Sequence, residues 1–334
     1  MGNNTILLSH GSGGRQSKEL LDIIYRTLSH VVINHGEDSG VFYAVEGKAA
    51  ITTDSYTIDP IFFPGGNIGK LAICGTTNDL AMVGAIPKYI TLSLIIEEGF
   101  GFDDLKKILI SIRDETKKGN ISIIAGDTKI VSRGKMDKIF INTAGFGEII
   151  TNTAISSHNA MPDDAVIITG DIGDHGAAIM AFRNGFESSL KSDCANVAPL
   201  IKALLEQGVI IHALRDPTRG GLASILNEIA SASNVNIVLE EEKLPIKESV
   251  SGVCDALGID PLYMACEGRA VIICPQDETD KVLKILHNEP LGSNAQIIGL
   301  VAERSDEPKL YLRTFIGAKR ILPLLSREQT PRIC

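Results

Sequence analysis

The feature that most constrains the fold is a polar break, "NAMPDD" at Asn159–Asp164, between two series of strand-like and helical segments. Before the break, an apolar helical segment from Ile68 to Gly84 leads into a buried strand-like run, "YITLSLII". After the break, the run "AVIITG" and a Gly-rich turn begin the second series. Strands and helices are mixed but do not alternate strictly, which favours an α+β (mixed α/β) fold over a doubly wound parallel sheet.

The length of 334 residues suits two domains better than one. We expect an N-terminal domain over residues 1–155 and a C-terminal α+β domain over residues 156–318. From Arg320 onward no hydrophobic periodicity remains, so residues 319–334 are predicted to form a mobile tail without regular structure.

Charge and cysteine content exclude several classes of protein. The net charge of −9 argues against binding to nucleic acid, because no excess of Lys and Arg exists to neutralise phosphates. The six cysteines form no CxxC pair, which argues against a zinc site or a disulfide framework and fits a reducing cytosol. The N-terminus does not have the pattern of a signal peptide, and the most apolar stretch is interrupted by polar residues. We therefore expect a soluble cytoplasmic protein that does not contact membranes.

Four aspartates stand where an acid is unusual or well placed for chemistry. Asp79 lies within an otherwise small and apolar helical segment, where an unpaired carboxylate needs a cation or hydrogen-bond donors. Asp54, Asp127 and Asp216 lie at probable ends of strands or helices. Each has a local alternative: a salt bridge for Asp79, an Asx turn for Asp127, and a helix N-cap for Asp216. Together they suggest oxygen ligands for Mg²⁺.

Gly-rich turns accompany these acids at "HGSGG" (His10–Gly14), "PGGNIGK" (Pro64–Lys70) and "RGG" (Arg219–Gly221). Backbone N–H groups at such turns can hold phosphate oxygens. None of the three turns matches a standard nucleotide-binding fingerprint, so the motif alone has low specificity. The residues therefore indicate a Mg²⁺–nucleotide site built from dispersed acids.

The chain ends on a cysteine, in "LPLLSREQTPRIC". Termini usually tolerate any residue, and an exposed thiol is an oxidation liability. Cys334 is thus either an accident of an unstructured end or the reactive tip of a mobile arm.

Several of these segments resemble the HypE family of hydrogenase maturation proteins: "HGSGG", "TTDSYTIDPIFFPGGNIGKLAICGTTNDLAMVGAIP", "GDTKIV", "INTAGFG", "RDPTRGG" and the terminal "PRIC". That family belongs to the superfamily of aminoimidazole ribonucleotide synthetase and selenophosphate synthetase. The resemblance runs from about Leu8 to Cys334. It implies an ATP-binding N-terminal domain whose strands pair across a homodimer, a C-terminal α+β domain, and ATP in the cleft between the domains.

The resemblance also implies a reaction. In this family a carbamoyltransferase, HypF, loads a carbamoyl group onto the terminal cysteine, here Cys334. ATP then drives dehydration of the S-carbamoyl group to an S-cyanate. The cyanide ligand passes towards the iron centre of a [NiFe]-hydrogenase, with a HypC–HypD complex as the receiver. Sulfur suits this role because it can hold the carbamoyl group and later release the nitrile carbon.

Site residues follow from the same resemblance. The expected metal ligands are Asp54, Asp79, Asp127 and Asp216. The expected contacts to ATP are Gly11, Ser12, Gly13, Gly14, Asn67, Lys70, Asn78 and Asp127. Lys129 and Glu267 are the candidate bases near the Cys334 thiol, although each could also be an ordinary surface residue. His175 could touch phosphate or substrate, but a structural role at its strand-to-helix turn is the simpler interpretation.

Two other functions remain open at this point. One is a sister activity of the superfamily on a diffusible substrate, such as a small-molecule kinase. The absence of a cysteine in "HGSGG" counts against a selenophosphate synthetase, and the terminal cysteine counts against the other sisters. The other is a scaffold without catalysis that docks partners through its tail.

Overall fold

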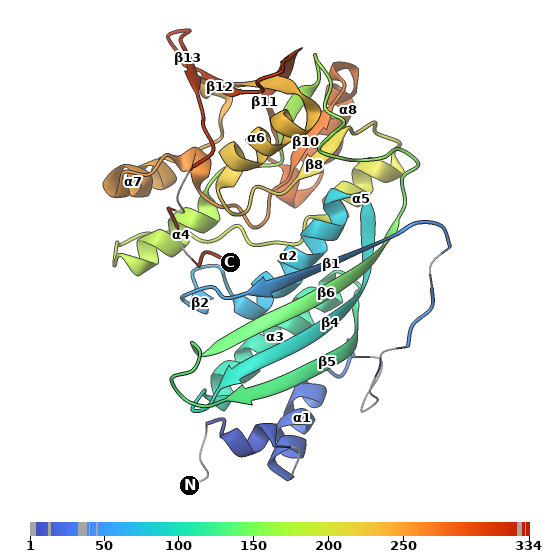
Figure 1. The fold of residues 1–334 in the computed structure, drawn as a ribbon, viewed down its shortest axis with the longest axis vertical. Coiled ribbons are helices and arrows are strands. Elements are labelled where there is room, and N and C mark those ends of the chain that lie inside the picture. The colour runs from blue at the N-terminus through green and yellow to red at the C-terminus, as the bar shows by residue number, and fades with distance from the viewer. Residues whose placement is uncertain are drawn as a thin grey trace.

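A computed structural model describes residues 5–12, 15–32, 39, 41–44, 46–325, 329–330 and 332–334. It contains two large sheets, each packed against its own helices, with helix α2 running between them (Figure 1). Helices and mixed sheets occur in both halves of the chain, which confirms the predicted α+β class. No helix within the described ranges is long and apolar enough to cross a bilayer.

The N-terminal sheet has four strands in the order β1-β6-β4-β5. The strands are β1 (Ala49–Tyr56), β4 (Ala85–Glu97), β5 (Ser122–Val131) and β6 (Ile139–Ile149). Only the β4–β5 pair is parallel. The other elements of this half are η1 (Leu8–Gly11), α1 (Arg15–Thr27), the hairpin β2 (Phe62–Phe63) and β3 (Gly66–Asn67), α2 (Ile68–Met82) and α3 (Phe102–Lys118).

Helix α2 is the central packing element of this half. It is buried along almost its whole length because it contacts the N-terminal sheet, α3 and α5 at once. This explains why the segment is apolar on every side rather than amphipathic. The helix ends before Gly84, whose φ of +76° lets the chain reverse into β4. The predicted helix over Ile68–Gly84 and the strand in "YITLSLII" are both present.

The C-terminal sheet has seven strands in the order β13-β12-β9-β11-β7-β10-β8. The strands are β7 (Ala165–Ile168), β8 (Ala213–Arg215), β9 (Val235–Glu240), β10 (Val271–Cys274), β11 (Gln296–Arg304), β12 (Leu310–Arg313) and β13 (Lys319–Ile321). The helices are α4 (Asp174–Arg183), α5 (Ala198–Glu206), α6 (Gly221–Ser233), α7 (Glu248–Leu257) and α8 (Thr279–His287). Short 3₁₀ turns complete this half at η2 (Glu241–Lys243), η3 (Pro261–Tyr263), η4 (Gln276–Glu278) and η5 (Pro290–Gly292).

The predicted tail over residues 319–334 needs correction at both of its ends. Its first residues form strand β13, which pairs antiparallel with β12, and Leu322 is buried in the C-terminal core. At the other end Ile333 is buried in the core of the N-terminal half. Burial and a strand partner outweigh the lack of periodicity in so short a segment. The chain end lies between the two halves, beside α4 and β2 (Figure 1).

Candidate active site

Three predicted metal ligands come together beside α2. Asp54 lies on β1, Asp79 lies on α2, and Asp216 directly follows β8. The Thr52 hydroxyl donates to Asp79 Oδ2 at 3.0 Å. Burial raises the pKa of Asp79, the Thr52 hydrogen bond opposes that shift, and the nearby Asp54 carboxylate adds to it. Among the described residues no Lys or Arg forms an ion pair with Asp79, so the salt-bridge alternative is wrong.

Asp216 and Glu267 extend this group into the interior. Burial, and then the charge of Asp79, raise the pKa of Asp216 to about 7. Burial, and then the charge of Asp216, raise the pKa of Glu267 well above its usual range. Helix α6 begins only at Gly221, so Asp216 is not its N-cap. When neighbouring buried carboxylates have raised pKa values, binding a proton or a cation near them is favourable.

Glu267 has an unusual environment for a glutamate. Its side chain is 2% exposed, and Oε1 has no hydrogen-bond partner in the described part of the protein. Its main chain is held firmly, because its N–H donates to Asp193 Oδ1 at 3.0 Å. An orphan carboxyl oxygen in a rigid, buried position is costly unless a ligand or proton occupies it. Glu267 is therefore a strong candidate for chemistry.

Asp127 does not join the other three acids within one chain. Asp54 pairs with Thr143 on β6, while Asp127 lies on β5 opposite Ser93 of β4. Three strand spacings separate β1 from β5, which amounts to about 14 Å. Asp127 is exposed, and Lys129 Nζ lies 2.6 Å from its carboxylate, which lowers the pKa of Asp127.

Lys129 is consequently far from Glu267 in the fold of a single chain. Both Asp127 and Lys129 align with residues on the sheet face away from α2, the face on which Ser55 lies. The described His, Cys, Asp and Glu side chains contain no group of three placed to ligate one metal ion. The predicted set of four metal ligands is therefore not assembled in one chain. Asp54 and Asp79 lie near enough to Asp216 to raise its pKa, but the three carboxylates are not placed to ligate one ion in a single chain.

The first Gly-rich turn lies beside Asp127. Gly11, Gly126, Asp127 and Thr128 are among the residues that line a pocket of about 300 Å³, whose other walls are mostly apolar side chains of α1, β4 and β5. Ser12 follows Gly11 and is exposed. Gly13 and Gly14 lie outside the described residues. A mostly apolar pocket that also has glycines and a few polar groups in its lining has the character of a ligand site.

Asn67, Lys70 and Asn78 have structural hydrogen bonds. Asn67 is the N-cap of α2 and accepts from Gly69 N–H at 2.9 Å and Lys70 N–H at 3.1 Å. Lys70 Nζ donates to the Gly65 carbonyl. The Asn67 side chain is thus engaged in a helix cap, and its contact with ATP stays a prediction.

Asn78 joins the two halves of the molecule. Its Oδ1 accepts from Val197 N–H at 2.8 Å, and its Nδ2 donates to the carbonyls of Ala195 and Glu267. With donors and acceptor engaged, the Asn78 amide fixes the position of Glu267 instead of reaching a ligand.

Cys334 lies beside the segment that follows β1. Thr57, which follows β1, donates its N–H to the Cys334 carbonyl at 3.2 Å. The half-buried Cys334 side chain packs against the apolar cluster that contains Tyr56, Cys74 and Cys194. The pKa values of Tyr56 and Cys194 are raised, chiefly by burial for Tyr56 and by the Cys74 hydrogen bond for Cys194, with Glu267 adding to both. The chain end and Glu267 therefore both lie near members of one apolar cluster.

Two residues in this region could not be assigned from the sequence. His175 is fully buried, and its Nε2 lies 2.8 Å from the Ile333 carbonyl. Arg183 donates to the Arg332 carbonyl at 2.6 Å. The polar turn "GDHGAA" was a signal for His175, whereas nothing in the local sequence distinguishes Arg183 from a surface arginine.

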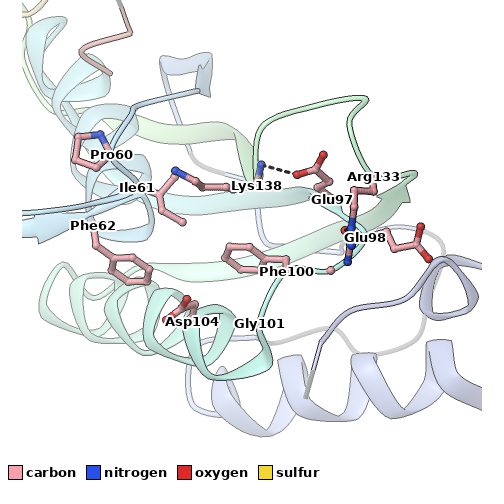
Figure 2. Close-up of a pocket in the computed structure, with 11 residues that line it drawn as sticks. Pro60, Ile61, Phe62, Glu97, Glu98, Phe100, Gly101, Asp104, Arg133 and Lys138 are labelled. Carbon is pink, nitrogen blue, oxygen red and sulfur yellow. Dashed lines mark hydrogen bonds between the residues drawn. The ribbon is translucent and has the colours of Figure 1, made fainter. Parts of the chain in front are cut away.

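A second hollow, of about 540 Å³, lies on the N-terminal half away from the acid group (Figure 2). None of the predicted site residues lines it. Its charged side chains are engaged locally: Glu97 accepts from the N–H groups of Gly134 and Lys138, and Lys138 Nζ lies 3.4 Å from Asp59. This hollow therefore offers no catalytic constellation.

Comparison with known proteins identifies the family. Residues 36–149 match the model for the N-terminal domain of AIR synthase related proteins, and residues 161–309 match the model for their C-terminal domain. Carbamoyl dehydratase HypE of Rhizobium leguminosarum bv. viciae is 44% identical, over 99% of this chain and 96% of the relative.

Solved structures agree with this assignment. The crystal structure of the hydrogenase maturation protein HypE in complex with ATP is 41% identical, with a TM-score of 0.94 over 99% of this chain and 100% of that chain. A HypE–HypF complex contains a chain that is 42% identical, with a TM-score of 0.80 over 93% of this chain and 100% of that chain. The chain described here therefore belongs to the AIR synthase related proteins and, among them, to the HypE family of hydrogenase maturation proteins.

Proposed function

We propose that this chain is an ATP-dependent carbamoyl dehydratase that converts an S-carbamoyl group on its own Cys334 into an S-cyanate. The observation that carries the proposal is the seating of the chain end: Ile333 is buried and Cys334 packs against the cluster that borders Glu267. A scaffold that docks partners through its tail does not require the terminal thiol to enter the interior. The likeness to a HypE structure with ATP and to carbamoyl dehydratases of 44% identity supports the same activity.

The overall reaction balances with ATP as co-substrate. The carbamoyl oxygen takes the γ-phosphoryl group, and the N–H protons leave as the C≡N bond forms. The phosphorylated oxygen departs as inorganic phosphate, so the products are S-cyanate, ADP and phosphate. Phosphoryl transfer depends mainly on positioning and on neutralising charge, which is consistent with few reactive side chains at the site.

Glu267 is the residue best placed to take a proton from the carbamoyl nitrogen. Its raised pKa makes its carboxylate a stronger base than that of an exposed glutamate. Its orphan Oε1 is available for a hydrogen bond, and Asn78 and Asp193 fix its main chain. Such fixing restricts the carboxyl to one position, which aids proton transfer.

Mg²⁺ fits the acids Asp54, Asp79 and Asp216, because the pKa values of Asp79 and Asp216 are raised, first by burial, and the Asp54 carboxylate adds to both shifts. When bound, the ion neutralises charge on the phosphates of ATP. The Thr52 hydrogen bond to Oδ2 fixes the Asp79 carboxylate, and it therefore also fixes the direction of Oδ1. We assign the purine to the pocket of about 300 Å³ and the phosphates to its Gly11 end.

A homodimer completes this site. Asp127 and Lys129 lie on the face of the N-terminal sheet opposite α2, and Ile51 on that face is 79% exposed. A second copy packed on this face brings its own Asp127 and Lys129 towards the acids that one chain gathers. This accounts for the separation of about 14 Å between the two groups.

The partners follow from the chemistry and from the relatives. A HypF-type carbamoyltransferase loads Cys334, as suggested by the HypE–HypF complex in the same family. A HypC–HypD complex receives the cyanide ligand for the Fe(CN)₂CO centre of a [NiFe]-hydrogenase, and the reaction takes place in the cytoplasm.

The test is the stoichiometry of ADP formation. Chains carbamoylated on Cys334 are mixed with Mg-ATP and quenched after single turnovers. We expect one ADP per carbamoylated chain, and none from uncarbamoylated chains or from Cys334→Ala. ADP formation that does not depend on whether Cys334 is carbamoylated, and that rises with an added small molecule, would favour a small-molecule kinase of the same superfamily. No ADP in any sample would favour a scaffold.

A further inference from the structure

The last three residues of the chain run antiparallel to the segment that follows β1. Thr57 N–H donates to the Cys334 carbonyl at 3.2 Å, and Asp59 N–H donates to the Arg332 carbonyl at 3.3 Å. Arg332 Nε returns a hydrogen bond to the Thr57 carbonyl at 2.9 Å. The N-terminal half thus offers the chain end a strand-like edge, which is a general way to hold an extended peptide.

Helix α4 of the C-terminal half holds the same tripeptide from the other side. His175 near its first turn lies 2.8 Å from the Ile333 carbonyl. Arg183 at its last residue donates to the Arg332 carbonyl and to the Asp59 carbonyl, both at 2.6 Å. Arg183 therefore ties the tail and its edge strand to one helix. With Thr57 and Asp59, this gives every carbonyl of the tripeptide at least one donor.

The hydrogen bonds of His175 fix its tautomer. The Ile333 carbonyl can only accept, so Nε2 carries the proton and donates. Nδ1 must then accept from the Ser192 hydroxyl at 2.7 Å, and Ser192 Oγ accepts from Cys194 N–H at 3.0 Å. The ring also packs edge-on against Phe63 at 5.5 Å. Burial lowers the pKa of His175 to about 4, so the ring is neutral at physiological pH.

We propose that His175 and Arg183 form a clamp on α4 that seats the chain end for dehydration and must open for Cys334 to be loaded outside. Both are positioning residues, because they contact the main chain of the tail and not the reacting atoms. The inference rests on the proposed function for its role in dehydration. The clamp itself rests only on contacts to Arg332 and Ile333.

The other five cysteines are buried, so a thiol reagent applied to the native protein reports on Cys334. Labelling of a seated thiol follows the fraction of time the tail is released. We expect His175→Leu and Arg183→Met each to raise the rate of maleimide labelling at Cys334 about tenfold, the effect of one lost hydrogen bond in a buried setting. His175→Gln keeps an N–H donor of similar reach and is expected to label near the wild-type rate.

The same variants are then carbamoylated with a HypF-type carbamoyltransferase, and ATP-dependent loss of water is timed. His175→Leu is expected to be loaded at least as fast as wild type and dehydrated about tenfold more slowly, with His175→Gln restoring most of the rate. Should His175→Leu fail to fold, as judged by circular dichroism, Arg183→Met at the surface end of α4 decides the question.

Three outcomes would overturn the clamp. The first is wild-type labelling in both His175→Leu and Arg183→Met. The second is faster labelling with an unchanged dehydration rate, which removes the positioning role. The third is His175→Gln behaving like His175→Leu, which indicates a role of the ring in packing alone. If wild-type protein shows no dehydration, the proposed function fails, while the labelling rates still decide whether the clamp exists.

Discussion

The two edge strands of the N-terminal sheet present acids in opposite settings. Beside β1, Asp79 and Asp216 are held near Asp54, and the pKa values of Asp79 and Asp216 are raised, first by burial. On β5, Asp127 is exposed next to Lys129 and its pKa is lowered. The same residue type therefore has opposite pKa shifts at the two edges. Among the described residues no ion pair forms with Asp79 or Asp216, although the charge of Arg215 lowers the pKa of both, whereas Lys129 pairs directly with Asp127.

The largest expected effect is at the buried edge. Glu267→Gln keeps the shape of the side chain but cannot accept a proton, so we expect single-turnover dehydration to fall by about 10³-fold. Glu187→Gln, at an exposed position, is the matched control and should keep wild-type activity. The rate of S-cyanate formation measures both. A Glu267→Gln rate within about tenfold of wild type would remove Glu267 as the base.

Lys129→Met tests whether Lys129 on β5 of one chain serves the active site of a second copy. We expect a loss of about 10²-fold in dehydration. Mixing inactive Lys129→Met and Glu267→Gln homodimers should restore up to about a quarter of wild-type activity, because half of the dimers then have one intact site of two. If both residues act from the same copy, every site in the mixture is defective and no activity returns.

The raised pKa of Asp216 predicts that the stability of the fold depends on pH. Its pKa is about 7 in the folded chain, against about 3.9 for an unfolded aspartate. The folded state thus binds more protons between these values, so stability falls as pH rises from about 4 to about 7 and then levels off. The loss is at most roughly 4 kcal/mol.

Urea unfolding in the presence of a chelator, at about pH 5 and about pH 8, measures this change in the free energy of unfolding. Asp216→Asn removes the titrating group, so its stability should change less between the two pH values than that of wild type. An equal change in both proteins would contradict the raised pKa of Asp216.

The smallest effect is expected at Asn67, which we expect to stabilise the fold without taking part in dehydration. Asn67→Ala removes the N-cap of α2 and should lower the free energy of unfolding by about 1 kcal/mol. Asn67→Asp keeps an N-cap acceptor and should restore most of it. Dehydration measured well below the melting temperature should be unchanged in both. A large loss of activity in Asn67→Asp would return Asn67 to the cofactor site.

Much of the fold could be predicted because its signals are local. The apolar segment at Ile68–Gly84 forms the expected helix, and the apolar run "YITLSLII" forms the expected strand. Strand β13 could not be predicted, because three residues give no period and the strand depends on its partner β12. The prediction of a tail failed for the same reason at Ile333, whose burial depends on residues far away in sequence.

The sequence predicted the site residues that are unusual in their local segment. It could not predict the roles that depend on which residues lie nearby in the folded chain. Asp79 stood out in an apolar segment, and the structure gives it acidic neighbours. Asp127 carries an equally suggestive motif, yet strand order places it at the opposite edge of the sheet. Asn67 and Asn78 lie in the right segments, but their amides complete a helix cap and a link between the two halves. Only tertiary structure distinguishes these roles.

The most direct test of the central claim is the intact mass of the chain after incubation with a HypF-type carbamoyltransferase, carbamoyl phosphate and Mg-ATP. Fragmentation then locates any modification within the C-terminal peptide. We expect Cys334 to carry a carbamoyl adduct that has lost one water, with the intact carbamoyl adduct as its precursor at early times. A carbamoyl adduct that keeps its water with Mg-ATP, or a Cys334 that is never modified, would rule out ATP-dependent dehydration on Cys334.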